Sequence, residues 1–462
     1  MVDFGHTENE SLLDKGIALY NHKAFDQALA VFQKLVALQP NHAVAHYNIG
    51  NVYSDLGNLD EAIASYHKAI QVGGLDEDAS LAWYNLGNIY YRKADVPKAV
   101  DAYRTAISIN RGLAMAYNNL GLVLAAQPDK ASRREAITVL ENARKLKSDD
   151  IDVLNNLGIA YGGLGNMDKA LALFNKAREL KPRDSKAYIN SAKAITEKGG
   201  DINKAITLLK KAGKIAPDDF NVHYNLGGNL SRKAERERSP DGHRELLNQA
   251  IASYHKALRI KPDDFNCLYN LAGDYLKKAE RASRKQRDKL RPDVHRELLD
   301  KAIAFYRKAI KSNPAHPAGY FNLAHAFEEK GDYENAINNY RKAIEIKPDH
   351  ADAYYNLSNT YRQQGKLTEA IKPLETALLI YQKQKNHFKA AHCYFHLGGI
   401  YAGMTQRKKS IQMHLRSLKI AGKLKNRGLE AANYAMLVGL YGQQDKLKQV
   451  RQAARKLLKI VK

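Results

Sequence analysis

The nine residues WYNLGNIYY, Trp83–Tyr91, decide the fold of this chain. Trp83, Leu86 and Tyr90 are spaced three and four residues apart, which predicts a helix with one apolar face, and Gly87 leaves a gap in that face. Near-copies of the stretch recur as HYNIGNVY, HYNLGGNL, LYNLAGDY, YFNLAHAF and YYNLSNTY. Packing explains their apolar residues. It does not explain the asparagine after the aromatic residue, because asparagine is a mediocre helix former.

The copies belong to a repeat of about 34 residues that runs through the whole chain. A small or compact residue anchors each unit, and the anchors are Gly16, Gly50, Gly87, Gly121, Gly158, Ala192, Gly227, Ala272, Ala324, Ser358, Gly398 and, weakly, Val438. A second small residue, usually alanine, follows each anchor, after 12 residues in eight of the twelve units. Such a fixed period predicts stacked supersecondary units rather than one globular core.

Each unit has the composition of two short helices. After Ala99, for example, come Tyr103 and Ala106 at helical spacing, so that a second helix can approach the first at Gly87. A proline often closes the unit, as at Pro40, where a helix must end. Two such helices cannot bury both of their apolar faces alone, so neighbouring units are expected to stack.

The pattern Trp83–Leu86–Gly87–Tyr90, followed by Ala99, Tyr103 and Ala106, resembles the tetratricopeptide repeat (TPR). The resemblance covers nearly the whole chain as about twelve helix-turn-helix units. It implies an all-α fold, a right-handed α-α superhelix whose concave face is lined by the first helix of each unit. Long arrays of this type resemble the non-catalytic TPR arm of O-GlcNAc transferase.

The repeats predict five segments. Residues 1–8 form an N-terminal tail, 9–219 hold repeats 1–6, and 317–390 hold repeats 9–10. In 220–316 the two helices of each unit are separated by charged insertions, at 231–248 and 276–300, which share PD-x-HRELL and suggest longer first helices followed by a proline-containing loop. These insertions are either docking elements or solvated helical extensions. Residues 391–462 form basic 40-residue units, which resemble kinesin light chains, and a C-terminal capping helix.

Composition favours a helical protein of the cytoplasm. Only two cysteines occur, Cys267 and Cys393, too few for a disulfide framework. The sequence has neither a signal-peptide pattern nor a stretch of about 20 apolar residues. The net charge of +24 is uneven, because residues 362–462 hold 21 Lys and Arg against 4 Asp and Glu.

No catalytic constellation is present, and we expect neither an enzyme nor a cofactor. The sequence lacks a P-loop, G-x-S-x-G and H-E-x-x-H. His392 and His396 lie four residues apart, with Cys393 beside them, but a zinc site needs a third ligand, and His387 and His414 are the nearest candidates. The simpler interpretation is that these side chains belong to an ordinary repeat, so no metal site is predicted.

The recurring asparagine precedes the anchor by two residues in nine consecutive units. This asparagine series is Asn48, Asn85, Asn119, Asn156, Asn190, Asn225, Asn270, Asn322 and Asn356. In the TPR superhelix this position faces the concave groove, where side-chain amides suit the backbone of an extended peptide. The alternative is that each asparagine bonds to the neighbouring repeat. Neighbours such as Tyr84 and Asn88 would add contacts to a ligand.

We therefore expect a scaffold or adaptor that binds an extended, acidic partner segment. The alternative function is binding of RNA, another nucleic acid or an anionic membrane surface by the basic end. Its candidate residues are Lys408, Lys409, Arg416, Lys419, Lys423, Lys425 and Arg427. The sequence does not predict an oligomeric state.

Overall fold

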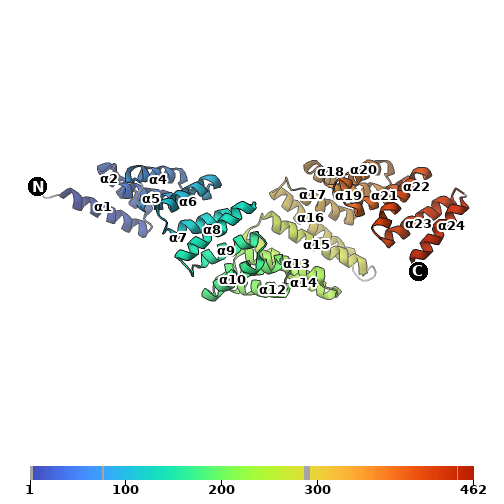
Figure 1. The fold of residues 1–462 in the computed structure, drawn as a ribbon, viewed down its shortest axis with the longest axis horizontal. Helices are drawn as coiled ribbons and strands as arrows, with labels where there is room; N and C mark the ends of the chain where they lie inside the picture. The colour runs from blue at the N-terminus through green and yellow to red at the C-terminus, as the bar shows by residue number, and fades with distance from the viewer. Residues whose placement is uncertain (1–3, 75–76, 286–291, 445, 462) are drawn as a thin grey trace. The chain divides into compact units, whose positions relative to one another are not determined.

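The computed structural model describes residues 4–74, 77–285, 292–444 and 446–461, and every element in those ranges is an α-helix (Figure 1). The chain divides into two compact units, Met1–Pro217 and Asp218–Lys462. The helices of the first unit are α1 Phe4–Asn21, α2 Phe25–Leu38, α3 Ala43–Leu56, α4 Leu59–Gly73, α5 Glu77–Arg92, α6 Val96–Ile109, α7 Ala114–Ala125, α8 Lys130–Leu146, α9 Ile151–Gly163, α10 Met167–Leu180, α11 Ser185–Glu197 and α12 Ile202–Ile215.

The second unit continues the same order of paired helices. Its helices are α13 Phe220–Arg236, α14 Pro240–Ile260, α15 Phe265–Lys285, α16 Pro292–Ser312, α17 Pro317–Lys330, α18 Tyr333–Ile346, α19 Ala351–Gln363, α20 Leu367–Lys383, α21 His387–Gly403, α22 Arg407–Lys423, α23 Arg427–Gly442 and α24 Leu447–Val461. The predicted all-α fold is confirmed. Helix α1 begins at Phe4, inside the segment predicted as a tail.

Odd-numbered helices form the inner side of each unit, and even-numbered helices form the outer side. Within a repeat, α5 packs on α6 and α13 on α14, and each second helix then packs on the next first helix. First helices also contact one another, as α3 with α5 and α7 with α9, whereas successive second helices in the described chain have no comparable contact. Each unit therefore curves toward its first helices.

The predicted anchors are the points where the two helices of a repeat meet. A Cβ atom added at Gly87 would lie 2.6 Å from the ring of Tyr103, which is 1% exposed. Ala99 and Ala106 flank this ring and are fully buried. Where serine replaces alanine in the second helix, its hydroxyl is satisfied locally, because Ser410 Oγ donates to the Gly398 carbonyl at 2.8 Å.

The helix ends follow local sequence signals. Carboxylates at Asp150, Asp201 and Asp219 accept hydrogen bonds from backbone N–H groups in the first turns of α9, α12 and α13. Gly57, with φ +84°, ends α3 in a left-handed conformation that favours glycine. Pro40 follows the C-cap of α2, as predicted.

Both helices of each pair are lengthened in residues 220–316, and the longer first helices α13 and α15 are as predicted. Helix α14 starts at Pro240 and α16 at Pro292, so the predicted proline-containing loop is wrong. Proline is favoured in the first turn of a helix because its missing N–H would have no partner there. We call α13–α14 and α15–α16 the long repeats. Residues 286–291 of the second insertion lie outside the described residues.

The PD-x-HRELL motif shared by the long repeats has a structural role. His243 on α14 donates from Nδ1 to the Ala234 carbonyl in the last turn of α13, at 2.6 Å. The equivalent His295 on α16 donates to the Ala279 carbonyl of α15, at 3.2 Å. Each histidine therefore holds the extended end of its first helix against the second helix.

The last repeats have long second helices, which account for their 40-residue spacing. Helices α20 and α22 are each 17 residues long, compared with 14 in α18. Helix α24 packs on α23 and buries Ala453, while Leu447 and Leu458 are 67% and 60% exposed. The apolar side chains of this predicted capping helix are therefore buried only in part.

Candidate functional site: the asparagine series and an acidic pocket

All nine predicted asparagines lie on the inner helices, one per repeat, and all are half-buried. They occupy α3, α5, α7, α9, α11, α13, α15, α17 and α19 in order. The helical spacing that puts the anchor glycine against the second helix turns the residue two positions earlier toward the preceding first helix. The series therefore follows the inner face of both units.

The clearest arrangement is in the first unit, where side chains of successive inner helices hydrogen-bond. Asn85 Nδ2 donates to the Tyr47 hydroxyl and to Asn51 Oδ1 of the preceding repeat, both at 3.1 Å. One repeat later, Asn119 Nδ2 donates to the Tyr84 hydroxyl at 3.1 Å and to Asn88 Oδ1 at 2.9 Å. Tyr84 and Asn88, predicted as ligand neighbours, are thus acceptors for Asn119. We call these inter-repeat bonds the asparagine ladder.

The ladder continues with other partners. Asn156 and Asn190 donate to Asn118 and Asn155 of the preceding inner helices, at 2.9 and 3.4 Å. In the second unit, Asn270 donates to the Tyr224 hydroxyl at 3.3 Å, and Asn322 donates to the Tyr269 hydroxyl at 2.5 Å. These bonds show that the alternative interpretation, bonding to the neighbouring repeat, applies to most of the series.

Three members are held differently. Asn48 and Asn225 donate to the carbonyls of Val44 and Asn221 on their own helices, at 2.9 and 2.7 Å. Asn356 interacts with the hydroxyl of Tyr340. Asn48 and Asn225 are the first members of the series in the first and second units. The bonds to the preceding repeat therefore begin at the second member in each unit.

The hydrogen bonds of the ladder are donated by the amide Nδ2 atoms and do not involve the oxygens of the same side chains. Both hydrogens of Asn85 Nδ2, and both of Asn119 Nδ2, have acceptors. Within the described chain, the side-chain oxygens of Asn85, Asn119 and Asn322 accept no hydrogen bond. The hydrogen-bonding groups of these three asparagines that remain unused in the described chain therefore include acceptors.

A pocket of about 560 Å³ opens on the inner face of the long repeats. We call it the acidic pocket. It is lined by Tyr224, Asn225, Gly228, Asn229, Ser231, Arg232, Glu235, Tyr254, Tyr269, Asn270, Gly273, Asp274, Leu276, Lys277, Glu280, Tyr306 and Asn322. Three members of the asparagine series lie in its wall, so the pocket belongs to the same inner surface.

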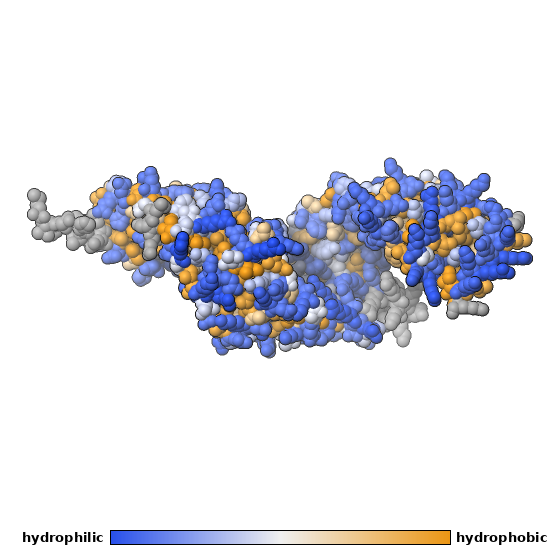
Figure 2. All heavy atoms as spheres, viewed as in Figure 1, coloured by the Kyte–Doolittle hydropathy of each residue, from blue (hydrophilic) through white to orange (hydrophobic). Residues whose placement is uncertain are grey.

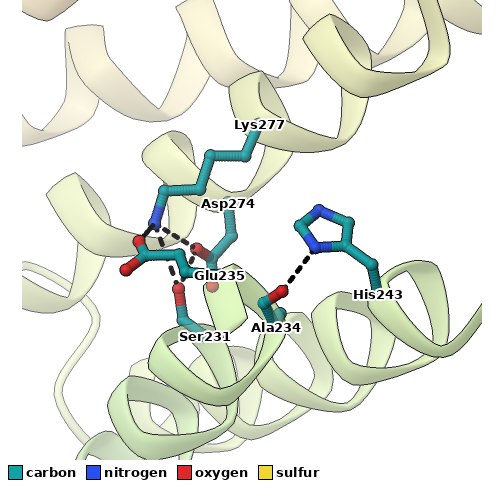
Figure 3. A network of polar contacts seen from close by, with 6 residues as sticks. All are labelled: Ser231, Ala234, Glu235, His243, Asp274 and Lys277. Carbon is teal, nitrogen blue, oxygen red and sulfur yellow. Dashed lines mark hydrogen bonds and ion pairs between the residues drawn. The ribbon is translucent and has the colours of Figure 1, made fainter. Parts of the chain in front are cut away.

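Asp274 lines this pocket and is the buried member of a network of polar contacts with Ser231 and Lys277 (Figure 3). Its side chain is 2% exposed, and Ser231 Oγ donates to its Oδ1 at 2.5 Å. Lys277 Nζ lies 3.5 Å from the same oxygen but only 2.6 Å from Glu235 Oε1. Burial raises the pKa of the Asp274 carboxyl to about 6, although Ser231 and Lys277 act in the opposite direction.

Sequence reasoning missed Asp274. The signal was present, because the equivalent position, two residues after the anchor, is apolar in most repeats, as at Val52, Ile89 and Ile400. An aspartate in NLAGDY at a position that is buried elsewhere predicts a buried charge, which proteins rarely retain without a partner.

The basic patch lies on the outer side of the second unit. All seven of its predicted residues are exposed, and they lie on α22, in the turn that follows it and at the first residue of α23. Beyond Lys389, no basic side chain in the described residues forms an ion pair. Hydrophilic side chains cover much of the visible surface of these last helices, with apolar ones between them (Figure 2). The patch is therefore separate from the asparagine series.

The histidines near Cys393 form aromatic and polar contacts. His396 Nδ1 lies 2.9 Å from Arg362 Nη1, and its ring is at right angles to those of Tyr355 and Phe395. Cys393 and Cys267 are buried free thiols. Throughout the ranges that the structure describes, no three His, Cys, Asp or Glu side chains are grouped for metal binding.

Among the described residues, no helix combines the length and the apolar character that a membrane span requires.

Comparison with known proteins identifies the family to which the repeats are similar. The family model described as cilia and flagella-associated protein 70 C-terminal domain matches residues 3–235. Three models of the tetratricopeptide repeat match residues 305–338, 325–361 and 349–423. The likeness to O-GlcNAc transferase and kinesin light chains stays a prediction.

A curated relative is the human protein O-mannosyl-transferase TMTC3, 26% identical over 197 residues, which is 40% of this chain. This chain spans 21% of that relative's length. A TPR protein with an unusual peptide-binding site, YrrB, is 27% identical with a TM-score of 0.35, covering 41% of this chain and 95% of its own. The human IFIT1 dimer with m7Gppp-AAAA is 14% identical with a TM-score of 0.48, covering 91% and 90%. The family models and the repeat geometry together show that this chain belongs to the tetratricopeptide repeat family.

Proposed function

We propose that this chain is a non-enzymatic scaffold that holds an extended segment of a partner protein along its inner helices. TPR architecture is usually non-catalytic and supports a protein-interaction scaffold. The observation that carries the proposal is the asparagine ladder, because its bonds orient half-buried amides whose oxygens accept no hydrogen bond within the described chain. Each such oxygen is positioned to accept a backbone N–H of a bound peptide.

The spacing of the inner helices suits this role. Packed helices lie about 8–10 Å apart, so successive ladder oxygens recur at about that distance. A peptide in the polyproline II conformation advances about 3.1 Å per residue and completes a turn in three residues, which is about 9.3 Å. Every third N–H of such a segment would face the ladder. Recognition would depend on the backbone more than on particular side chains.

Two paired variants of the first unit test the proposal. Replacing Asn85 and Asn119 by alanine removes two ladder oxygens together with their inter-repeat bonds. Replacing Tyr47 and Tyr84 by phenylalanine removes one inter-repeat bond from each asparagine but keeps both oxygens. Binding is measured by selecting peptides from a phage-displayed library of random dodecapeptides and titrating the selected peptides by fluorescence anisotropy.

We expect the alanine pair to weaken peptide binding by roughly 10-fold or more, since about 1 kcal/mol is lost for each hydrogen bond. The phenylalanine pair should bind nearly as the wild type does. Equal losses in the two pairs would show that the ladder only joins the repeats, and failure of the wild type to select any peptide would refute the proposed function.

A second candidate function is binding of an anionic partner by the basic patch. The supporting observation is the row of exposed cations on α22, such as Lys408 and Arg416, without ion pairs in the described chain. A salt titration of random-sequence RNA in a filter-binding assay tests it, because phosphate contacts give a steep dependence on salt. Retention that is absent near physiological salt would refute RNA binding. An acidic protein or membrane surface would use the same charges.

A further inference from the structure

The acidic pocket contains a buried acceptor that the protein itself does not use. Asp274 Oδ2 is buried and has no hydrogen-bond partner in the described residues, whereas Oδ1 is bonded to Ser231. A buried carboxylate oxygen without a partner is costly, and native proteins satisfy most such groups. Because Asp274 lines the pocket, a ligand can reach the space beside it.

Packing does not explain this aspartate. In most repeats the equivalent position holds a buried apolar side chain, as at Val52 and Ile89, which are 0% and 1% exposed. In the long repeats this position holds Asn229 on α13 and Asp274 on α15, and Ser231 and Lys277 lie beside Asp274. A buried charge in a cleft, at a position that packing fills with apolar side chains elsewhere, is a candidate functional group.

The long helices supply further acidic groups. Ordinary inner helices end about five residues after the anchor, and α3 ends at Leu56, six residues after Gly50. Helices α13 and α15 continue past that point, which brings Glu235 and Glu280 into the wall of the pocket. The insertions thus extend the inner surface and add both acidic and basic side chains to the pocket wall, Glu235 and Glu280 together with Arg232 and Lys277.

The chemistry of the walls selects a cation that carries N–H groups. Glu235 already holds the ammonium of Lys277 at 2.6 Å, so the site accommodates such a group. The half-buried rings of Tyr224 and Tyr269 add aromatic faces that attract organic cations.

We propose that the acidic pocket holds an arginine or lysine side chain of the segment bound along the inner helices, with Asp274 Oδ2 accepting from its terminal N–H. This inference rests on the proposed function and gives the backbone-directed groove one side-chain preference. Asn270 and Asn322 lie in the same wall, so the peptide backbone and its basic side chain are held together.

The experiment repeats the selection from random dodecapeptides with the full chain, and compares the wild type with Asp274→Asn. The variant keeps the shape of the side chain but replaces one buried acceptor by a donor. The control is Asp300→Asn, which makes the same charge change at an exposed residue on α16, paired with Lys330. Selected peptides, and copies with glutamine in place of the basic residue, are titrated against each protein.

We expect wild-type and Asp300→Asn proteins to select peptides with arginine or lysine at one aligned position. Asp274→Asn should lose that enrichment and bind the basic peptides roughly 10- to 100-fold more weakly, while binding the glutamine copies as the wild type does. Peptides selected without a basic position, or an enrichment that survives in Asp274→Asn, would overturn the pocket assignment alone. Selection of no peptide by the wild type would overturn the proposed function as well.

Discussion

Two neighbouring glycines in α21 separate the packing role of the anchor from the general cost of glycine in a helix. A Cβ atom at Gly398 would lie 2.6 Å from His414 Nε2, and His414 is fully buried. The ring cannot easily move away, because its Nδ1 is hydrogen-bonded to Asn433 at 3.1 Å. At Gly399 the added atom would meet nothing within 4 Å. The two alanine substitutions should therefore have opposite effects.

We expect Gly398→Ala to destabilise the repeat by about 1–3 kcal/mol, the usual cost of overpacking a core. Gly399→Ala should stabilise the same helix by about 0.5–1 kcal/mol, because alanine loses less conformational freedom than glycine when it folds. The opening of a long repeat array is local, so a probe in the same repeat is needed.

The buried thiols provide that probe. Burial raises the pKa of Cys393 and Cys267 to about 12, so each reacts with iodoacetamide only when its repeat opens. Cys393 lies on α21, and Cys267 on α15 serves as an internal reference. Mass spectrometry of the two cysteine peptides follows both rates in one sample.

The Cys393 rate should rise roughly 5- to 150-fold in Gly398→Ala and fall about 2- to 5-fold in Gly399→Ala. The Cys267 rate should stay unchanged in both variants. Equal Cys393 rates in wild type and Gly398→Ala would refute the claim that the anchor is small because the second helix packs on it.

Two further predictions concern pH, both measured by urea unfolding followed by circular dichroism. The folded-state pKa of Asp274, about 6, lies above the ordinary value of 3.8, so the unfolded chain ionises first and wild-type stability falls as pH rises from about 4 through 6. Asp274→Asn should match the wild type at pH 4 and exceed its stability by about 3 kcal/mol at pH 8; equal curves would contradict the buried charge. His396 gives the opposite dependence of stability on pH. Burial, with Arg362 nearby, lowers its folded-state pKa to about 4. The unfolded chain therefore binds a proton first as the pH falls below about 6.5. The free energy of unfolding of the wild type should fall by about 2 kcal/mol between pH 7 and 5 because of this residue. The variant His396→Asn, which places the residue of the asparagine series in that repeat, should remove this fall. An unchanged dependence of stability on pH in the variant would show that His396 does not titrate as inferred.

The fold could be predicted from sequence because its packing rule is short and repeated. Gly87 meets Tyr103 only 16 residues later in the chain, and the same pair of positions recurs along the chain, as Gly50 with Tyr66 shows. The loop predicted at the long repeats was wrong because a proline can either end a helix or begin one. Only the packing of the extended α13 on α14 favours the second outcome.

The candidate site could be predicted only in part. The sequence located the asparagines, because their period matches that of the anchors, but it could not show which atoms of each amide are in use. Asn85 donates to Asn51, 34 residues earlier, and that bond depends on how two repeats stack. Asp274 shows the same limit, since its environment combines Ser231, 43 residues earlier, with the wall of the next repeat.

By itself the sequence determined the helices, the pairing and the repeat, because helical periodicity and small-to-large packing act within one unit. The tertiary structure decided what the inner face offers to a ligand. Stacking of the repeats places the amide donors of the asparagine ladder, as at Asn85, in hydrogen bonds, but not the amide oxygens of the same side chains. It also buries Asp274 Oδ2 without a hydrogen-bond partner in the described chain. Both outcomes depend on distances between side chains of different repeats, which no local pattern contains.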